Sequence, residues 1–218
     1  MHASREKDAQ AAEDKLFRYG AFTKNRVEAF SDGVFAIIVT LLILEIKVPD
    51  IQESGSVLAL RDSLTALLPK FVSWVISFLT LCIVWMNHHR LFDMFKGINV
   101  GLFWLNVNLL LWVCFVPFPT ALMGDYPHNP LAVAFYGAIM ACTGISFVLT
   151  RLYGLKHKSL LKETVSLKKY KRAILFAFIF AVCLYCAGAC LAWVHTYFSF
   201  AVYFLIAFYF VFSFATKE

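Results

Sequence analysis

Six apolar stretches, each about as long as a membrane is thick, constrain the fold of this chain more than any other feature. A helix that crosses the hydrocarbon core of a bilayer needs about 20 mostly apolar residues. With 61% hydrophobic residues and a mean hydropathy of +0.71, the chain has more apolar surface than a soluble globule buries. The sequence therefore predicts an all-α membrane protein with six transmembrane helices, roughly at residues 27–48, 69–88, 99–123, 131–152, 173–194 and 197–215.

The distribution of basic residues predicts the orientation of these helices. Of the 20 Lys and Arg residues, 17 lie in the N-terminal segment, in the loops after the second and fourth stretches, or beside the C-terminus. Basic loops stay on the cytoplasmic side of a membrane, so both termini are predicted to be cytoplasmic. The net charge of +6 is then explained by loops beside an anionic leaflet, and we expect no nucleic-acid partner.

The composition also predicts a simple domain organisation. Residues 1–25 mix both signs of charge without an apolar segment, which is typical of a solvated, partly disordered cytoplasmic tail rather than a signal peptide. Residues 26–218 then form one transmembrane domain. All six cysteines lie in apolar stretches, which argues against a disulfide framework. No nucleophile motif or phosphate-binding loop is visible, so we expect no catalytic residues and no enzymatic activity.

The first apolar stretch combines an apolar stripe with a small polar cluster. On a helical wheel, Ile37, Leu41 and Leu44 share one face, with Thr40 on the same side. Ser31 and Asp32 point well away from that face. By spacing alone, such a stripe is typical of contact with lipid or with another helix. A carboxylate inside a membrane is costly unless it has partners, so Asp32 is expected to be paired.

The residues of the first three stretches carry a resemblance to a known family. They are similar to the transmembrane protein 175 potassium channels, over about half of the chain. The most specific motif lies in the first stretch, and shorter motifs close the first and second stretches and mark the third. These motifs are Arg26-x-x-x-Phe30-Ser31-Asp32 followed by Gly-Val-Phe-Ala-Ile, then Glu45-Ile-Lys-Val-Pro49, Asn87-His88-His89-Arg90 and Pro117-Phe-Pro-Thr120.

The resemblance implies a potassium-permeable channel without a pore loop, and no loop of the Thr-Val-Gly-Tyr-Gly type occurs in the sequence. In the family, the first helix of each six-helix unit lines the pore. One unit per chain implies a homotetramer in the plasma membrane of a prokaryote, as a multi-pass protein. The expected partners are the lipid bilayer, K⁺ and three further copies of the chain. No cofactor and no metal site are implied.

The resemblance also implies roles for individual residues. The hydrophobic constriction of the family corresponds to Ile37, Leu41 and Leu44, and Thr40 corresponds to a pore-facing hydroxyl. A narrow apolar ring gates by excluding water. The signature motif is expected to form a structural network between helices, in which the sequence leaves open which of the two adjacent histidines takes part. That network comprises Arg26, Phe30, Ser31, Asp32, His88 or His89, and Asn106.

Three alternatives are kept. The same fold could conduct protons, since some relatives also do. A secondary transporter would be expected to show inverted repeats and broken helices at mid-membrane, and no repeat is visible. His89 and Asp93, four positions apart, could begin a metal site, but a metal site needs three or four ligands and no third is evident.

Overall fold

The structure, a computed structural model, describes residues 23–52 and 55–215, and almost all of them lie in helices. The expected disorder of the tail concerns residues that lie mostly outside this range. Some predicted stretches are interrupted by a change of helix type. The elements are α2 (Lys24–Leu41), the 3₁₀ helix η1 (Leu42–Glu45), α3 (Val57–Ala66), α4 (Leu68–Asp93), α5 (Val100–Phe115), α6 (Pro117–Asp125), α7 (Pro130–Lys156), η2 (Lys158–Leu160), α8 (Leu167–Phe178), the π-helix η3 (Ile179–Cys183), α9 (Leu184–Leu191) and α10 (Thr196–Ala215).

Five helical rods are long and apolar enough to cross a membrane, so the prediction of an all-α membrane protein is confirmed at this level. The rods are Lys24–Glu45, Leu68–Asp93, Val100–Asp125, Pro130–Lys156 and Leu167–Leu191. The last helix is also apolar and counts as a shorter segment, Thr196–Phe212. Several rods extend beyond the predicted stretches, because basic segments such as the start of α8 continue a helix past the apolar core.

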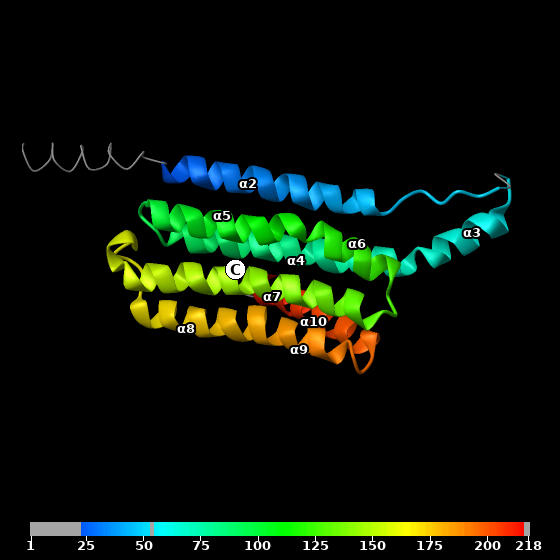
Figure 1. Ribbon diagram of the computed structural model, residues 1–218. Coiled ribbons are helices and arrows are strands. Elements are labelled where there is room, and N and C mark those ends of the chain that lie inside the picture. Colours follow the sequence, from blue (N-terminus) through cyan, green and yellow to red (C-terminus); the bar gives the residue numbers. More distant parts are fainter. Residues whose placement is uncertain (1–22, 53–54, 216–218) are drawn as a thin grey trace, which may run out of the picture.

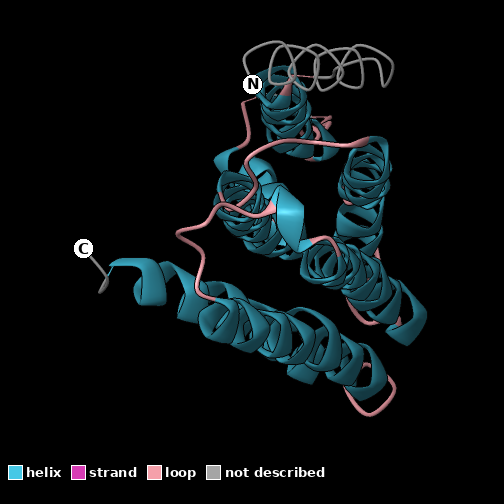
Figure 2. Cartoon of the chain, turned by 90° about the vertical axis from the view of Figure 1, so that its left-hand side faces the viewer, coloured by secondary structure: helices cyan, strands magenta, loops and turns pink. Residues whose placement is uncertain are grey.

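The rods lie side by side in alternating directions, with α2 at one edge and α8 and α9 at the opposite edge (Figure 1). Seen along their length, the helices pack as a bundle (Figure 2). The most enclosed rod is α7, which has 61% of its apolar window buried, against 28% for the rod formed by α2 and η1. The fifth rod, at 17%, and the first are therefore the two least buried, and the first contacts α4 and α5.

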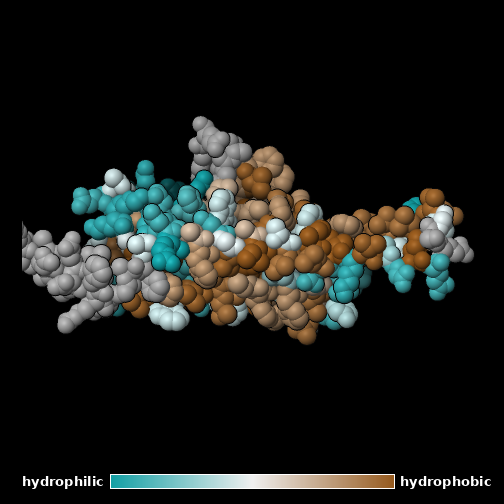
Figure 3. Space-filling view, turned by 90° about the horizontal axis from the view of Figure 1, so that it is seen from above, coloured by the Kyte–Doolittle hydropathy of each residue, from teal (hydrophilic) through white to brown (hydrophobic). Residues whose placement is uncertain are grey.

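Hydrophilic side chains gather at one end of the bundle, and hydrophobic ones cover its middle (Figure 3). At this end, the loop after α4 and the loop after α7 are joined by an antiparallel bridge between Phe95 and Leu161. Lys162 Nζ also reaches Asp93 Oδ1 at 2.6 Å. These contacts bring the basic loops together on one side of the molecule.

The third rod is interrupted at Pro117, between α5 and α6. Pro117 has no backbone N–H, so the helix restarts there, and the N–H of Val116 bonds three residues back to Val113. The restart orients Thr120 toward α4, where its hydroxyl oxygen lies 2.7 Å from that of buried Ser77. The Pro-Phe-Pro-Thr motif thus serves to pin α6 onto α4.

The fifth rod contains the π-helical turn η3 between α8 and α9. Opposite this turn lies Gly144 of α7, where a Cβ would overlap the carbonyl group of Ala181. Small residues allow membrane helices to approach this closely. The tight contact and the widened turn shape the space between α7 and α8.

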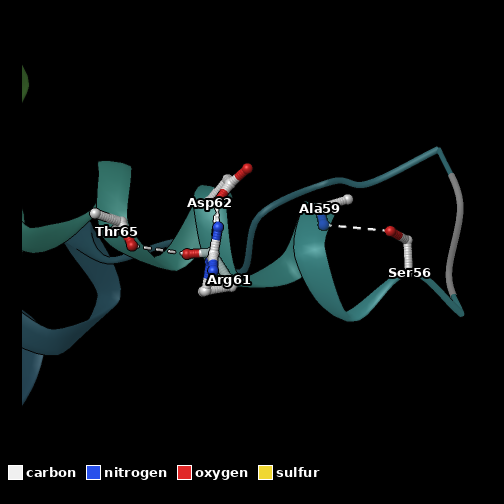
Figure 4. Close-up of polar contacts among 5 residues, drawn as sticks. All are labelled: Ser56, Ala59, Arg61, Asp62 and Thr65. Atoms are coloured by element: carbon white, nitrogen blue, oxygen red, sulfur yellow. Dashed lines mark hydrogen bonds and ion pairs between the residues drawn. The ribbon is translucent and has the colours of Figure 1, made fainter.

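One helix that the sequence does not predict, α3, projects from the end of the bundle opposite the basic loops (Figure 1). Ser56 caps it by accepting from the N–H of Ala59, Arg61 pairs with Asp62, and Thr65 donates to the Arg61 carbonyl (Figure 4). These local contacts stabilise a helix in which no residue is buried.

Candidate functional site

The first helix has two distinct faces. Its buried face consists of Val27, Ser31, Phe35 and Ile38, and Leu42 of η1 continues it. Residues three and four positions apart lie on one side of a helix, so these five form a single stripe. That stripe packs against α4 and α5.

The opposite face of the same helix is apolar and exposed in the single chain. Ile37 is 60% exposed, Leu41 44% and Leu44 66%. Leu41 ends α2 and Leu44 lies three positions later in η1, and side chains at that spacing eclipse in a 3₁₀ helix. The change of helix type therefore keeps Leu44 in line with Leu41. An exposed apolar face of this kind must be covered by lipid or by another copy of the chain.

Thr40 lies on this exposed side, but its hydroxyl proton is turned into the helix. Its Oγ1 donates to the carbonyl oxygens of Ile37, at 2.8 Å, and Ala36, at 3.0 Å. A hydroxyl oxygen has two lone pairs beside its proton. With the proton engaged, Thr40 can present only acceptor lone pairs to its surroundings, which suits a cation.

A buried polar network joins the first helix to two others. Asn106 Nδ2 of α5 donates to Ser31 Oγ at 2.9 Å, and Asn106 Oδ1 lies 2.8 Å from Nε2 of His88 on α4. An amide oxygen can only accept, so His88 carries its proton on Nε2. The Ser31 hydroxyl itself donates a hydrogen bond to the carbonyl oxygen of Val27 at 2.9 Å. All three side chains are buried and have hydrogen-bond partners.

The expected partners of Asp32 are wrong. Its Oδ1 accepts from Nε1 of Trp85 on α4 at 2.8 Å, and the contact is exposed in the single chain. Ser31 and Asp32 are adjacent and point about 100° apart on the helix, so only Ser31 faces Asn106. The carboxylate instead meets the indole, a donor without acceptor capacity.

Other residues of the expected network lie outside it. Phe30 is 58% exposed, and it is seven positions from Ile37, so two full turns place both on the exposed face. Arg26 is also exposed, at the start of α2. Of the two histidines, His88 is the buried one, whereas His89 is exposed and stacks on Trp85 with ring centroids 6.2 Å apart.

Trp85 is the residue that sequence reasoning missed. The signal was available, because an indole N–H in an apolar stretch needs an acceptor, and Asp32 was the carboxylate in need of a donor. The metal alternative finds no support at Asp93, whose carboxylate pairs with Lys162. Within residues 23–52 and 55–215, no three His, Cys, Asp or Glu side chains form a metal-binding group. All six cysteines are free thiols.

Comparison with known proteins gives one consistent result. Residues 26–117 match the family model described as the endosomal/lysosomal potassium channel TMEM175. A protein of Chryseobacterium sp. (strain P1-3) named a potassium channel is 37% identical, over 85% of this chain and 91% of its own length. One from Chamaesiphon minutus with the same designation is 37% identical over 85% and 92%. A zebrafish protein named an endosomal/lysosomal proton channel is 31% identical over 70% of this chain and 30% of its own length.

Solved structures agree with the sequence matches. The crystal structure of a lysosomal potassium-selective channel TMEM175 homologue from Chamaesiphon minutus superposes with a TM-score of 0.76 and 33% identity. It covers 87% of this chain and 97% of that one. A second crystal structure, of a point variant of the potassium channel MtTMEM175, superposes with a TM-score of 0.61 at 20% identity and shows likeness of fold alone.

Proposed function

This chain belongs to the TMEM175 family of ion channels and functions as a potassium channel, not as an enzyme; we propose that α2 from each of four copies lines its pore. The observation that carries this proposal is the exposed face of α2. That face holds Ile37, Leu41 and Leu44 in one line, while the opposite face already binds α4 and α5. Four such helices around an axis would cover one another's apolar faces.

The same arrangement supports a hydrophobic constriction. Rings of four Ile or Leu side chains form a neck that disfavours water, and such necks gate by dewetting. Thr40 would contribute a ring of acceptor oxygens beside the neck, because its proton is engaged by its own helix. These oxygens can replace part of the hydration shell of K⁺. Potassium sheds water more readily than sodium, so we propose that the neck favours K⁺.

The remaining features of the proposal concern topology. We propose that α10 is the sixth crossing and that both termini are cytoplasmic, because the basic loops lie together at one end of the bundle. Residues 26–218 then form a channel domain without a pore loop, in the plasma membrane. The permeant ion is K⁺, and no cofactor is required for passive flow.

The network of Ser31, Asn106 and His88 has a supporting role in this proposal. It ties the buried face of α2 to α4 and α5, and it thereby sets the direction of the exposed face. Asp32 adds a second tie to α4 through Trp85. Neither tie lies on the side of Ile37, so we propose that both hold the helix without touching permeating ions.

Proton conduction is the second candidate, because animal relatives are named proton channels. Between Gly33 and Leu44, the rod of α2 and η1 has no titratable side chain to relay a proton. Proton flow along this face would therefore need a continuous water file through the neck. Measuring K⁺ flux with and without a pH gradient, in the same vesicles, distinguishes K⁺ conduction from proton conduction. The channel family membership leaves no support for the transporter alternative.

Thiol modification tests the pore assignment. Leu41→Cys and Ile38→Cys, in a background without the native cysteines, place a thiol on the exposed and the buried face of the same helix. A charged methanethiosulfonate reagent should block K⁺ flux through Leu41→Cys channels in proteoliposomes and leave Ile38→Cys channels conducting. Blocking of neither, or of Ile38→Cys alone, would show that another face or another helix lines the pore.

A further inference from the structure

A second site lies on the opposite side of the bundle from α2. A cavity of about 560 Å³ is lined by α4, α7, the rod of α8, η3 and α9, and α10. Its walls include Phe147, Phe176 and Phe180, and it extends along α4 from Thr80 to Arg90. Ten residues of helix span about 15 Å, so the cavity is long enough for a polar group and several methylenes.

The end of the cavity nearest the basic loops is strongly cationic. Four basic side chains line it, contributed by three separate helices, and no acidic residue is among its lining residues within the described part of the chain. The four are Arg90 of α4, Arg151 of α7, and Lys169 and Arg172 of α8. An arrangement of this kind attracts a group that carries negative charge.

Arg151 is the buried one of these four basic side chains. Arg151 is only 7% exposed. Its Nε and Nη1 atoms are buried and have no hydrogen-bond partner among the described residues. Its backbone is held in place, because the buried Tyr170 hydroxyl donates to the Arg151 carbonyl at 3.0 Å. Two guanidinium nitrogens buried without partners inside a membrane helix are costly, so a negatively charged partner is expected there.

The depth of Arg151 indicates where that partner resides. Arg151 lies five residues before the end of α7 at Lys156, which is about 7 Å along the helix axis. This is the level of lipid head groups if the basic loops face an anionic leaflet. Phe176 of α8 and Tyr209 of α10 line the cavity, and both are exposed. An acyl chain in the cavity would therefore contact these two rings.

We propose that this cavity binds an anionic glycerophospholipid, with its phosphate on Arg151, Lys169 and Arg172 and an acyl chain along the aromatic wall. A phosphate offers several oxygens to the planar fork of a guanidinium, which binds such groups in a bidentate manner. A zwitterionic lipid would bring its own cation toward four others. Basic pockets between transmembrane helices on the cytoplasmic side are known to suit anionic head groups. At the inner end, Thr80 and Tyr185 hydroxyls without partners among the described residues suit water.

The cavity also adjoins the network behind the pore helix. Asn87 lines the cavity, and the next residue of α4, His88, bonds Asn106 in the network that holds Ser31. A bound lipid would thus steady the segment of α4 that positions α2. Binding itself does not depend on this link or on ion conduction, so it can be measured separately.

Native mass spectrometry tests the proposal on the purified full-length protein in mild detergent. The probes are palmitoyl-oleoyl phosphatidylglycerol and the matching phosphatidylcholine. The native protein should retain phosphatidylglycerol in preference, at one lipid per subunit. Arg151→Gln should weaken this binding about tenfold or more, as expected for a lost hydrogen-bonded charge pair, and Arg151→Lys should weaken it less.

Two further variants keep the test decisive if Arg151→Gln folds poorly. Arg172→Gln removes a charge at the more exposed mouth of the cavity, and it should also weaken phosphatidylglycerol binding. Lys171→Gln makes the same charge change on the adjacent residue, which does not line the cavity, and it should leave binding unchanged. If Arg172→Gln and Lys171→Gln weakened binding equally, surface charge alone would explain the effect, and the proposed site would be overturned.

The source of the anion is settled by competition. Millimolar inorganic phosphate should not displace the lipid, because the apolar wall contributes to binding. Full displacement would show that the cavity holds a free anion and would overturn the proposal that it binds a lipid. Equal retention of the two lipids by the native protein would overturn it as well, as expected if a carboxylate of a neighbouring copy pairs with Arg151.

Discussion

At the scale of single residues, the Asn106 amide is the point where three helices meet. Its nitrogen donates to Ser31 of α2 and its oxygen accepts from His88 of α4, while Asn106 itself belongs to α5. Helices in a membrane gain little from hydrophobic contact with each other, so polar contacts of this kind contribute to their association. One side chain therefore sets the position of the proposed pore helix.

Asn106→Ala should destabilise the protein by about 1–3 kcal/mol, because it leaves buried groups of Ser31 and His88 without a partner. Thermal unfolding of the detergent-solubilised protein measures this loss, and K⁺ flux per tetramer should fall as α2 loosens. Asn108→Ala is the matched control on the same helix, since Asn108 donates to Ser146 of α7 at 2.8 Å instead. Similar loss of flux in both variants would contradict the role assigned to Asn106.

The pair of Asp32 and Trp85 gives a second prediction. Asp32→Ala and Trp85→Phe each remove one partner of the 2.8 Å hydrogen bond. Each should reduce the yield of tetramer after extraction, and the double variant should be little worse than either single one. We expect a coupling of about 1 kcal/mol in a double-mutant cycle, because the bond is partly exposed.

The K⁺ over Na⁺ preference of Asp32→Ala channels tests whether Asp32 contacts permeating ions. The surviving Asp32→Ala channels should keep near-normal K⁺ over Na⁺ preference, because Asp32 points away from Ile37. A stable tetramer with altered selectivity would show that the carboxylate acts on the permeating ion. It would also show that the pore has been assigned to the wrong face of α2.

At the scale of elements, the first rod owes its function to having two unlike faces. The buried stripe is continuous from Val27 to Leu42, and the exposed stripe is continuous from Phe30 to Leu44. The change from α-helix to 3₁₀ helix at Leu42 keeps both stripes in register at the end of the rod. The apolar exposed stripe is the basis of the proposed neck.

Substitutions on the exposed stripe should change conduction in a graded way. Ile37→Asn should admit water to the neck and raise conductance, because a polar ring removes the dewetting barrier. Leu41→Ala should widen the neck and lower the K⁺ over Na⁺ preference. Single-channel recording of both variants, beside Ile38→Ala on the buried face as a control, measures these effects. Unchanged conductance and selectivity in the exposed-face variants would refute the neck.

At the scale of the whole molecule, the bundle is polarised. Its basic loops and their bridge lie at one end, and α3 projects from the other (Figures 1 and 3). The proposed lipid cavity opens near the basic end, and the proposed pore face lies on the far side of the bundle. A lipid and the permeating ions would therefore contact separate surfaces of each subunit.

Reporter fusions test this polarity together with the sixth crossing. Alkaline phosphatase inserted after Gly55, beside α3, should be active, because that loop is expected outside the cell. The same enzyme fused after Glu218 should be inactive, because an even number of crossings returns the C-terminus to the cytoplasm. Activity at both positions would show that α10 does not cross, and the reverse pattern would invert the orientation.

Much of the fold could be predicted because hydropathy and charge belong to each segment by itself. The five long rods, the break at Pro117 and the basic end of the bundle all follow from local composition. The helix α3 could not be predicted in this way, since its ten residues are too few to cross a membrane and it is stabilised by its own capping contacts. The π-turn η3 arises where α7 approaches closely at Gly144, which a single segment does not reveal.

The sequence by itself determined the class of the protein, its family and the residues that compose the signature motif, because these depend on which residues occur and at what spacing. Only the tertiary structure decided which side chains are hydrogen-bonded to each other. In it, His88 rather than His89 bonds Asn106, and Asp32 accepts a hydrogen bond from Trp85. Arg151 is buried where it lines a cavity. The physical reason is that hydrogen-bond partners in a membrane are chosen by the rotation and depth of neighbouring helices, and packing across the whole bundle sets both.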